Sequence, residues 1–132
     1  MIVVDSSAFI EYYRPGGDRH VRAAVAEVIA ADQVMINGII HVEIVAFASA
    51  RDDYERLSAD FRAFHWLDTG LQDYEHAAKM GFLLRRKGVT VPATDLIIAA
   101  SATRAEATLY HVDQHYVGIA EHTDLQERYL RP

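Results

Sequence analysis

The sequence predicts an α/β fold of three layers, in which helices cover both faces of a central, mostly parallel sheet. Short apolar runs rich in β-branched residues occur at residues 2–4, 34–36 and 108–112, and such runs are typical of strands buried on both faces. Longer segments with the helical spacing of apolar residues separate these runs. Strands that alternate with helices along a chain favour a parallel sheet, because parallel neighbours need a crossover connection.

The elements follow in order from the local pattern. Strands are predicted at residues 2–4, 34–36, 65–67 and 108–112, and helices at residues 6–13, 20–31, 39–50, 52–64, 72–87, 94–104 and 114–121. Ser6 or Ser7 can cap the first helix, and Gly88 suits the end of the longest one. The helix at 39–50 is apolar nearly all round, so we expect it to be central. The tail at 124–132 is polar.

Length and composition exclude several classes of protein. The chain has 132 residues and no internal linker or repeat, so we expect a single domain covering residues 1–132. No apolar stretch approaches the roughly 20 residues that a membrane span needs, and no secretory signal precedes the first strand. The absence of cysteine excludes disulfides, thiolate catalysis and cysteine-ligated zinc, and we expect a cytoplasmic protein.

The basic residues do not create a positive field over the whole protein. The net charge is −6, and 11 of the 13 basic residues are Arg, whose planar guanidinium suits phosphate. Arg85 and Arg86 end the longest predicted helix, where cations complement the helix dipole. The functional alternative is that they contact nucleic-acid phosphates, with Arg14 as a further candidate.

Four acidic residues interrupt or adjoin strongly apolar runs, namely Asp5, Glu43, Asp95 and Asp113. Carboxylates are rarely buried unless they are paired or bind a metal. Asp5 and Asp113 follow predicted strands, at the end of a parallel sheet where ligands bind. Glu43 and Asp95 lie in the opening turns of helices that would pack over the same edge. The joint placement predicts one shared acidic pocket.

Each acid also has a structural explanation that the sequence leaves open. Asp5 and Asp95 can cap the helices that follow them, and Asp113 can make a turn. The neighbours of Glu43 one helical turn away are apolar, so a solvated stripe does not account for it. A buried ion pair with an arginine is the remaining structural explanation for Glu43.

The chemistry of four clustered carboxylates points to a hard divalent cation, because they repel one another unless a cation neutralises them. Carboxylate oxygens are the ligands that Mg²⁺ or Mn²⁺ prefers. We expect Asp5, Asp95 and Asp113 to hold the ion, directly or through water. Glu43 would be an outer ligand or would orient the attacking water.

Three further side chains are candidates for the surroundings of this site. Ser6 and Thr94 can supply supporting hydroxyl groups, and helix capping is the alternative for both. His115 can line the acidic pocket, with a surface or structural role as the alternative. No helical pair of histidines with zinc-ligand spacing occurs.

At these residues the chain resembles a known family over nearly its whole length. Residues 3–7, Glu43 in its apolar helix, residues 92–102 and residues 109–116 are similar to the PIN-domain ribonucleases, particularly the small VapC-type toxins of bacterial toxin–antitoxin pairs. The resemblance implies a PIN-like fold and a metal-dependent endoribonuclease whose acidic quartet is the four acids named above. It also implies RNA as substrate, a small VapB-like antitoxin that covers the site, and a homodimer. Many relatives carry another acid at the position of His115.

Two other functions compete with this interpretation. The first is a phosphoacceptor signalling domain of the doubly wound receiver type, which also gathers acids at strand ends. Such a domain needs a lysine after a late strand, whereas Lys79 and Lys87 both lie in the longest predicted helix. The second is a catalytically inert PIN-like module that binds RNA or protein. The complete set of acids argues against it, because carboxylates repel phosphate unless a cation intervenes.

Overall fold

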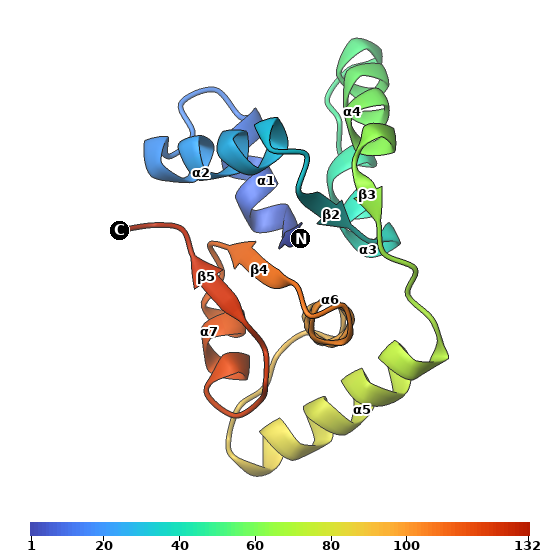
Figure 1. Cartoon of the computed structure of the whole chain (residues 1–132), viewed down its shortest axis with the longest axis vertical. Coiled ribbons are helices and arrows are strands. Elements are labelled where there is room, and N and C mark those ends of the chain that lie inside the picture. Colours follow the sequence, from blue (N-terminus) through green and yellow to red (C-terminus); the bar gives the residue numbers. More distant parts are fainter.

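The computed structural model describes residues 1–132 as seven helices around one five-stranded sheet (Figure 1). The strands are β1 (Ile2–Val4), β2 (Val34–Ile36), β3 (His65–Trp66), β4 (Thr108–His111) and β5 (Glu127–Tyr129). The helices are α1 (Ser6–Tyr13), α2 (Arg19–Ala30), α3 (Gly38–Val45), α4 (Arg51–Ala63), α5 (Leu71–Arg86), α6 (Ala93–Arg104) and α7 (Gln114–Ala120). All four predicted strands and all seven predicted helices are present, and β5 is an addition.

The sheet is parallel throughout and has the strand order β3-β2-β1-β4-β5. In Figure 1 the strands run through the middle of the molecule, with α1, α2 and α4 above them and α5, α6 and α7 below. The predicted three-layer α/β class is therefore confirmed. A receiver-type domain has the order β2-β1-β3-β4-β5, so the sheet does not support the signalling alternative.

The core lies between the sheet and these helices. Val4 of β1 and Leu109 of β4 are fully buried, as expected for strands covered on both faces. Three aromatic side chains, Phe9, Phe61 and Tyr116, are fully buried in the core. The Phe9 ring packs against Phe61 and Phe64, with ring centroids 4.8 and 5.7 Å apart, which fastens α1 to α4 and the turn after it.

Three junctions between a strand and a helix are built in the same way. Asp5, Asn37 and Asp113 follow β1, β2 and β4 respectively, and each side chain accepts a hydrogen bond from a backbone N–H of the helix that follows. Such bonds satisfy donors that the first helical turn leaves free. The prediction that Ser6 or Ser7 caps α1 is wrong, because Asp5 occupies the cap position. Gly88 follows α5 with a positive φ of 79°, a backbone conformation that favours glycine.

The third helix differs from its prediction. It ends at Val45 instead of Ala50, and it is not central. One face of α3 is buried in the core through Ile40 and Ile44, while Val42 is 58% exposed and Phe47, just beyond the helix, is 80% exposed. α3 has apolar residues on all its sides, but only one side is buried, so the other side is an exposed apolar surface.

The polar tail forms β5, which its sequence pattern did not indicate. Leu125 and Leu130 on either side of the strand are buried, and the Leu130 N–H donates to the carbonyl of His111 at the end of β4. The strand has only three residues, and β4 supplies the pairing that stabilises it. None of the seven helices combines the length and the apolar character that a membrane crossing demands.

Candidate functional site

The candidate site lies where the order of the sheet reverses. β1 lies between β2 and β4. From β1 the chain continues to β2 on one side of the sheet, and from β4 it continues to β5 on the other side. In open parallel sheets, ligands bind outside the carboxyl ends of the strands at such a switch point. Asp5 follows β1 directly, and Asp113 follows β4 by two residues. The Asp5 N–H donates to the carbonyl of Tyr110 in β4, which fixes the two strand ends side by side.

Asp5 is held from both oxygens and is only 3% exposed. Its Oδ2 accepts hydrogen bonds from the backbone N–H and the hydroxyl of Ser7, at 3.0 and 2.6 Å. Its Oδ1 accepts a bond of 2.8 Å from the hydroxyl of Tyr116 on α7. The Ser7 hydroxyl also accepts from the N–H of Val112, at 3.1 Å, and so connects the ends of β1 and β4. These contacts give the carboxylate one fixed orientation.

Asp95 reaches the same place from the first turn of α6. The Tyr116 hydroxyl that contacts Asp5 also lies 3.3 Å from Asp95 Oδ1. The other oxygen, Oδ2, lies 2.9 Å from Nδ1 of His115. Burial raises the pKa of the Asp95 carboxyl, the hydrogen bond with His115 opposes this shift, and the negative charges of Asp5 and Asp113 add to it. Asp95 thus lies among like charges in a partly dry environment.

Asp113 and His115 complete a triangle with Asp95. The Asp113 carboxylate accepts from the backbone N–H of His115 and lies 3.3 Å from the Nδ1 atom of the same residue. One ligand atom from each of the three residues lies within 4.8 Å of the others, a spacing that can hold a metal ion. His115, for which the sequence left a surface role open, faces the acids.

Glu43 approaches from α3 and is half-buried. Its Oε1 accepts a hydrogen bond of 3.1 Å from the Ser6 hydroxyl, next to Asp5 in the chain. Burial raises the pKa of the Glu43 carboxyl, the Ser6 bond opposes the shift, and the charges of Asp5 and Asp95 raise it further. No lysine or arginine forms an ion pair with any of the four acids, so the arginine explanation for Glu43 is not supported.

Four other predicted residues do not join this cluster. Thr94 is exposed in the first turn of α6 and makes no side-chain hydrogen bond with the acids. Arg14 forms an ion pair with Glu11 at the far end of α1. Arg85 and Arg86 lie at the end of α5, and the Arg86 guanidinium stacks over the Phe82 ring at 4.9 Å. Their predicted contacts with RNA phosphates remain predictions.

Sequence reasoning missed three residues that organise the site, namely Ser7, His111 and Tyr116. His111 is fully buried; its Nδ1 accepts the N–H of Asp113, and its Nε2 lies 3.0 Å from Oε1 of Glu127 in β5. The Tyr116 ring packs against it with the centroids 5.1 Å apart. The available signal was the position of Tyr116 in the first turn of the helix that Asp113 caps.

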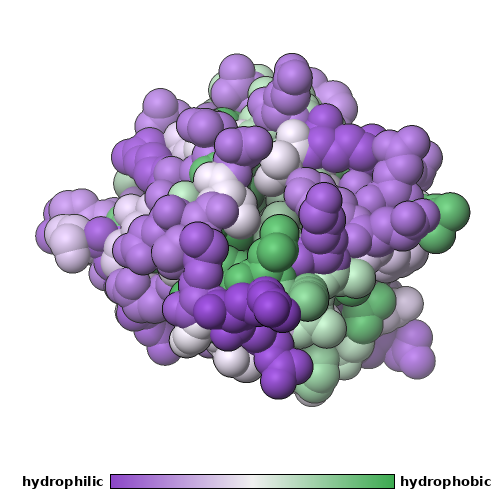
Figure 2. All heavy atoms as spheres, turned by 90° about the horizontal axis from the view of Figure 1, so that it is seen from below, coloured by the Kyte–Doolittle hydropathy of each residue, from purple (hydrophilic) through white to green (hydrophobic).

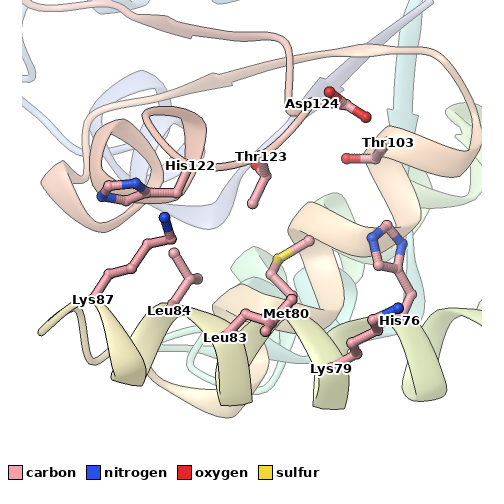
Figure 3. Close-up of a pocket in the computed structure, with 10 residues that line it drawn as sticks. All are labelled: His76, Lys79, Met80, Leu83, Leu84, Lys87, Thr103, His122, Thr123 and Asp124. Atoms are coloured by element: carbon pink, nitrogen blue, oxygen red, sulfur yellow. The ribbon is translucent and has the colours of Figure 1, made fainter.

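A hollow of about 400 Å³ lies elsewhere, between α5, the end of α6 and the turn after α7 (Figure 3). Its lining includes Lys79, Lys87, Thr103, His122 and Asp124. None of the four acids lines it. The acidic site is therefore recognised by its convergent side chains and by its position at the sheet edge. His122 and Asp124, in the turn after α7, line the separate hollow and offer residue types that match those of the acidic site.

Comparison with known proteins agrees with this fold. The PIN domain family matches residues 2–121. Ribonuclease VapC11 of Mycobacterium tuberculosis is 32% identical over 138 residues, which cover 99% of this chain and all of that relative. Ribonuclease VapC18 of the same organism is 27% identical, over 98% of this chain and 94% of its own length. The chain belongs to the PIN-domain family, and the resemblance seen in the sequence is confirmed.

Solved structures with similar folds include toxin–antitoxin complexes from Klebsiella pneumoniae and Mycobacterium tuberculosis. FitAB bound to an IR36 DNA fragment contains a chain that superimposes with a TM-score of 0.81 at 22% identity, covering 97% of this chain and 94% of that one. VapBC2 from Rickettsia felis, bound to a DNA fragment from its promoter, gives a TM-score of 0.72 at 16% identity, with 97% and 98% covered. At these identities the likeness concerns the fold.

Proposed function

We propose that this chain is a metal-dependent endoribonuclease that acts as the toxin of a toxin–antitoxin pair. The observation that carries the proposal is the convergence of four carboxylates without an arginine or lysine partner, two of them bridged by the Tyr116 hydroxyl. The names of the relatives, which are VapC ribonucleases, support RNA as the substrate.

The donor set fits a hard divalent ion such as Mg²⁺ or Mn²⁺. Carboxylate oxygens are the preferred ligands of these ions, and like charges at this density favour a cation. Asp5, Asp95 and Asp113 would hold it. When bound, such an ion lowers the pKa of a coordinated water, orients the phosphodiester and stabilises charge on the leaving oxygen.

The side chains around these ligands have separate tasks. The Tyr116 hydroxyl and Ser7 keep Asp5 in one orientation. The Asp5 carboxylate therefore loses no further conformational freedom when substrate binds. Glu43 orients the attacking water and accepts its proton. The upward shift of its pKa makes the Glu43 carboxylate a stronger proton acceptor than an ordinary glutamate.

The antitoxin has a candidate surface beside the site. Ile10 on α1, Val42 on α3 and Phe47 beyond it are exposed apolar side chains on the two segments that the Ser6–Glu43 hydrogen bond joins. Exposed apolar groups of this kind indicate a binding surface, and an amphipathic helix of a VapB-like partner would bury them and cover the acids.

A homodimer is also proposed, through the exposed face of α5. Leu71, Tyr74, Phe82 and Leu83 of α5 are exposed. Viewed from the α5 end, the surface shows apolar atoms gathered in one area among polar ones (Figure 2). A second copy would bury such an area, and analytical ultracentrifugation of the chain without its antitoxin tests for the dimer.

The experiment is incubation of the purified chain with total cellular RNA, with Mg²⁺ or Mn²⁺ or with a chelator, followed by mapping of new 5′ ends. Asp5→Asn and Asp95→Asn should lower cleavage by more than about 100-fold, beyond the loss seen when only a supporting partner of a metal ligand is removed. Asp124→Asn is the matched control, since Asp124 is exposed and distant, and it should cleave normally. Full cleavage by Asp5→Asn or Asp95→Asn, with unchanged circular dichroism, would refute the proposal.

A further inference from the structure

We infer that His115 is a direct nitrogen ligand of the metal site and that it makes the site select Mn²⁺ over Mg²⁺. This inference rests on the proposed metal-dependent function and concerns the choice of ion at the same site. It begins from one atom, Nδ1 of His115, which lies 2.9 Å from Asp95 Oδ2 and 3.3 Å from Asp113 Oδ1.

These two separations match the geometry of one coordination shell. Ligands at right angles on an octahedral ion with bonds of about 2.1 Å stand about 3.0 Å apart. The nitrogen and the two carboxylate oxygens are therefore close enough for one ion to contact all three. The three atoms share one small volume, within 4.8 Å of one another.

The position of the ring favours ligation over a purely structural role. The backbone N–H of His115 donates to Asp113, so the residue is anchored at the start of α7 and its ring is directed at the acids. The other ring nitrogen, Nε2, has no hydrogen-bond partner in the protein. The side chains of Asp113 and His115 are 34% and 44% exposed, so an ion can reach them from solvent.

A nitrogen ligand changes which ion the site prefers. Mg²⁺ binds oxygen donors and parts from its water reluctantly, whereas imidazole is a ligand for transition-metal ions. Mn²⁺ shares the preference of Mg²⁺ for carboxylate oxygen, but it belongs to the first-row transition-metal series, whose ions also bind sites with nitrogen donors. Mixed donors from Asp95, Asp113 and His115 therefore favour Mn²⁺ relative to a site of carboxylates alone.

The test compares the binding of the two ions by calorimetry at one neutral pH, using the full chain, its His115→Asp variant and its His122→Asp variant. His115→Asp converts the mixed site to oxygen donors only. The added negative charge attracts both divalent ions equally, so it cancels in the ratio of the two dissociation constants. His122→Asp makes the same change in charge on the exposed turn after α7, away from the acids.

The unmodified chain and His122→Asp should both bind Mn²⁺ more tightly than Mg²⁺. In His115→Asp the preference for Mn²⁺ over Mg²⁺, measured as the ratio of the two dissociation constants, should shrink by at least about tenfold. Removal of a residue that only supports a metal ligand already costs about tenfold in affinity, so loss of a direct ligand should cost no less. An unchanged ratio in His115→Asp would overturn this inference while leaving metal binding, and the nuclease, intact. Binding of neither ion by the unmodified chain would overturn both.

A second measurement needs no substitution at this position, in case His115→Asp does not fold. Zn²⁺ accepts imidazole and is diamagnetic, so the ¹⁵N resonances of the His115 ring can be followed by NMR during its addition to the unmodified chain. A selective shift of the Nδ1 resonance supports direct ligation. An Nδ1 resonance that stays in place while the ion binds contradicts it.

Discussion

The Tyr116 hydroxyl donates a 2.8 Å hydrogen bond to Asp5 Oδ1 across 111 positions of sequence, and it does so from a fully buried ring. The same hydroxyl reaches Asp95, so one neutral donor holds two carboxylates that repel each other. Burial raises the pKa of this phenol well above its usual range, and the negative charges of Asp5 and Asp95 raise it further. The shift favours the protonated phenol, which is the form that donates to the acids.

Tyr116→Phe should weaken both the fold and the site. The substitution leaves Asp5 Oδ1 buried without its donor, which costs about 1–3 kcal/mol of unfolding free energy. Metal affinity should also fall by about 10–100-fold, because the ligand loses the partner that orients it. Urea unfolding measures the first effect and calorimetry with Mn²⁺ the second. Wild-type affinity in a folded Tyr116→Phe variant would show that the hydroxyl does not position Asp5.

Glu43→Gln should stabilise the metal-free protein while abolishing cleavage. Because the folded pKa of Glu43 is raised, its contribution to stability is complete below the unfolded carboxyl pKa and is lost as the pH rises through the folded pKa. At neutral pH the ionised side chain therefore destabilises the metal-free fold. Gln removes that charge and keeps an acceptor for Ser6.

Thermal melts in a chelator across a pH series measure this effect. The melting temperature of Glu43→Gln should exceed that of the wild type at neutral pH, and the difference should vanish in acid. Glu75→Gln is the control, because Glu75 is exposed and has no ion pair, and it should show no such pH dependence. A constant difference across the series would contradict a raised pKa at Glu43.

His111→Phe should separate the C-terminal strand from the acidic site. The buried ring accepts the N–H of Asp113 and faces Glu127 of β5, and Phe can make neither contact. We expect a loss of about 1–3 kcal/mol in unfolding free energy and weaker Mn²⁺ binding, because Asp113 is less well held. Glu127→Gln still offers an acceptor to Nε2 and should bind Mn²⁺ almost normally. Equal effects of the two variants would argue against a link from His111 to Asp113.

Arg104→Ala should destabilise the fold without affecting the acids. Asp73 is buried, and Arg104 contacts it through two nitrogens at 2.7 and 3.1 Å. Burial raises the pKa of Asp73. The hydrogen bonds from Arg104 and from the Gly70 N–H have the larger combined effect, so the pKa lies below its usual value. Loss of the partner should cost about 1–3 kcal/mol, seen as a lower urea midpoint. Arg62→Ala, an exposed residue without an ion pair, should leave the midpoint unchanged.

Much of the fold and part of the site could be predicted because they are encoded locally. Apolar runs such as Ile2–Val4 and the helical periodicity before and after them predicted four strands, seven helices and a parallel sheet. The position of Asp5 directly after a strand predicted its place at the sheet edge. The catalytic and metal-binding roles of the four acids are proposals, supported by their convergence. The central position predicted for the helix at 39–50 was wrong, because an apolar pattern does not reveal whether an apolar face meets the core or a missing partner.

The sequence by itself determined the alternation of strands and helices and the kind of chemistry that four unpaired acids imply, since periodicity and residue type are local properties. Only the tertiary structure decided that β4 lies beside β1, that the polar tail becomes β5, and that Tyr116 and His115 face the acids. These outcomes depend on strand pairing and on side-chain hydrogen bonds between residues far apart in the chain. Their free energy comes from packing that no short window of sequence contains.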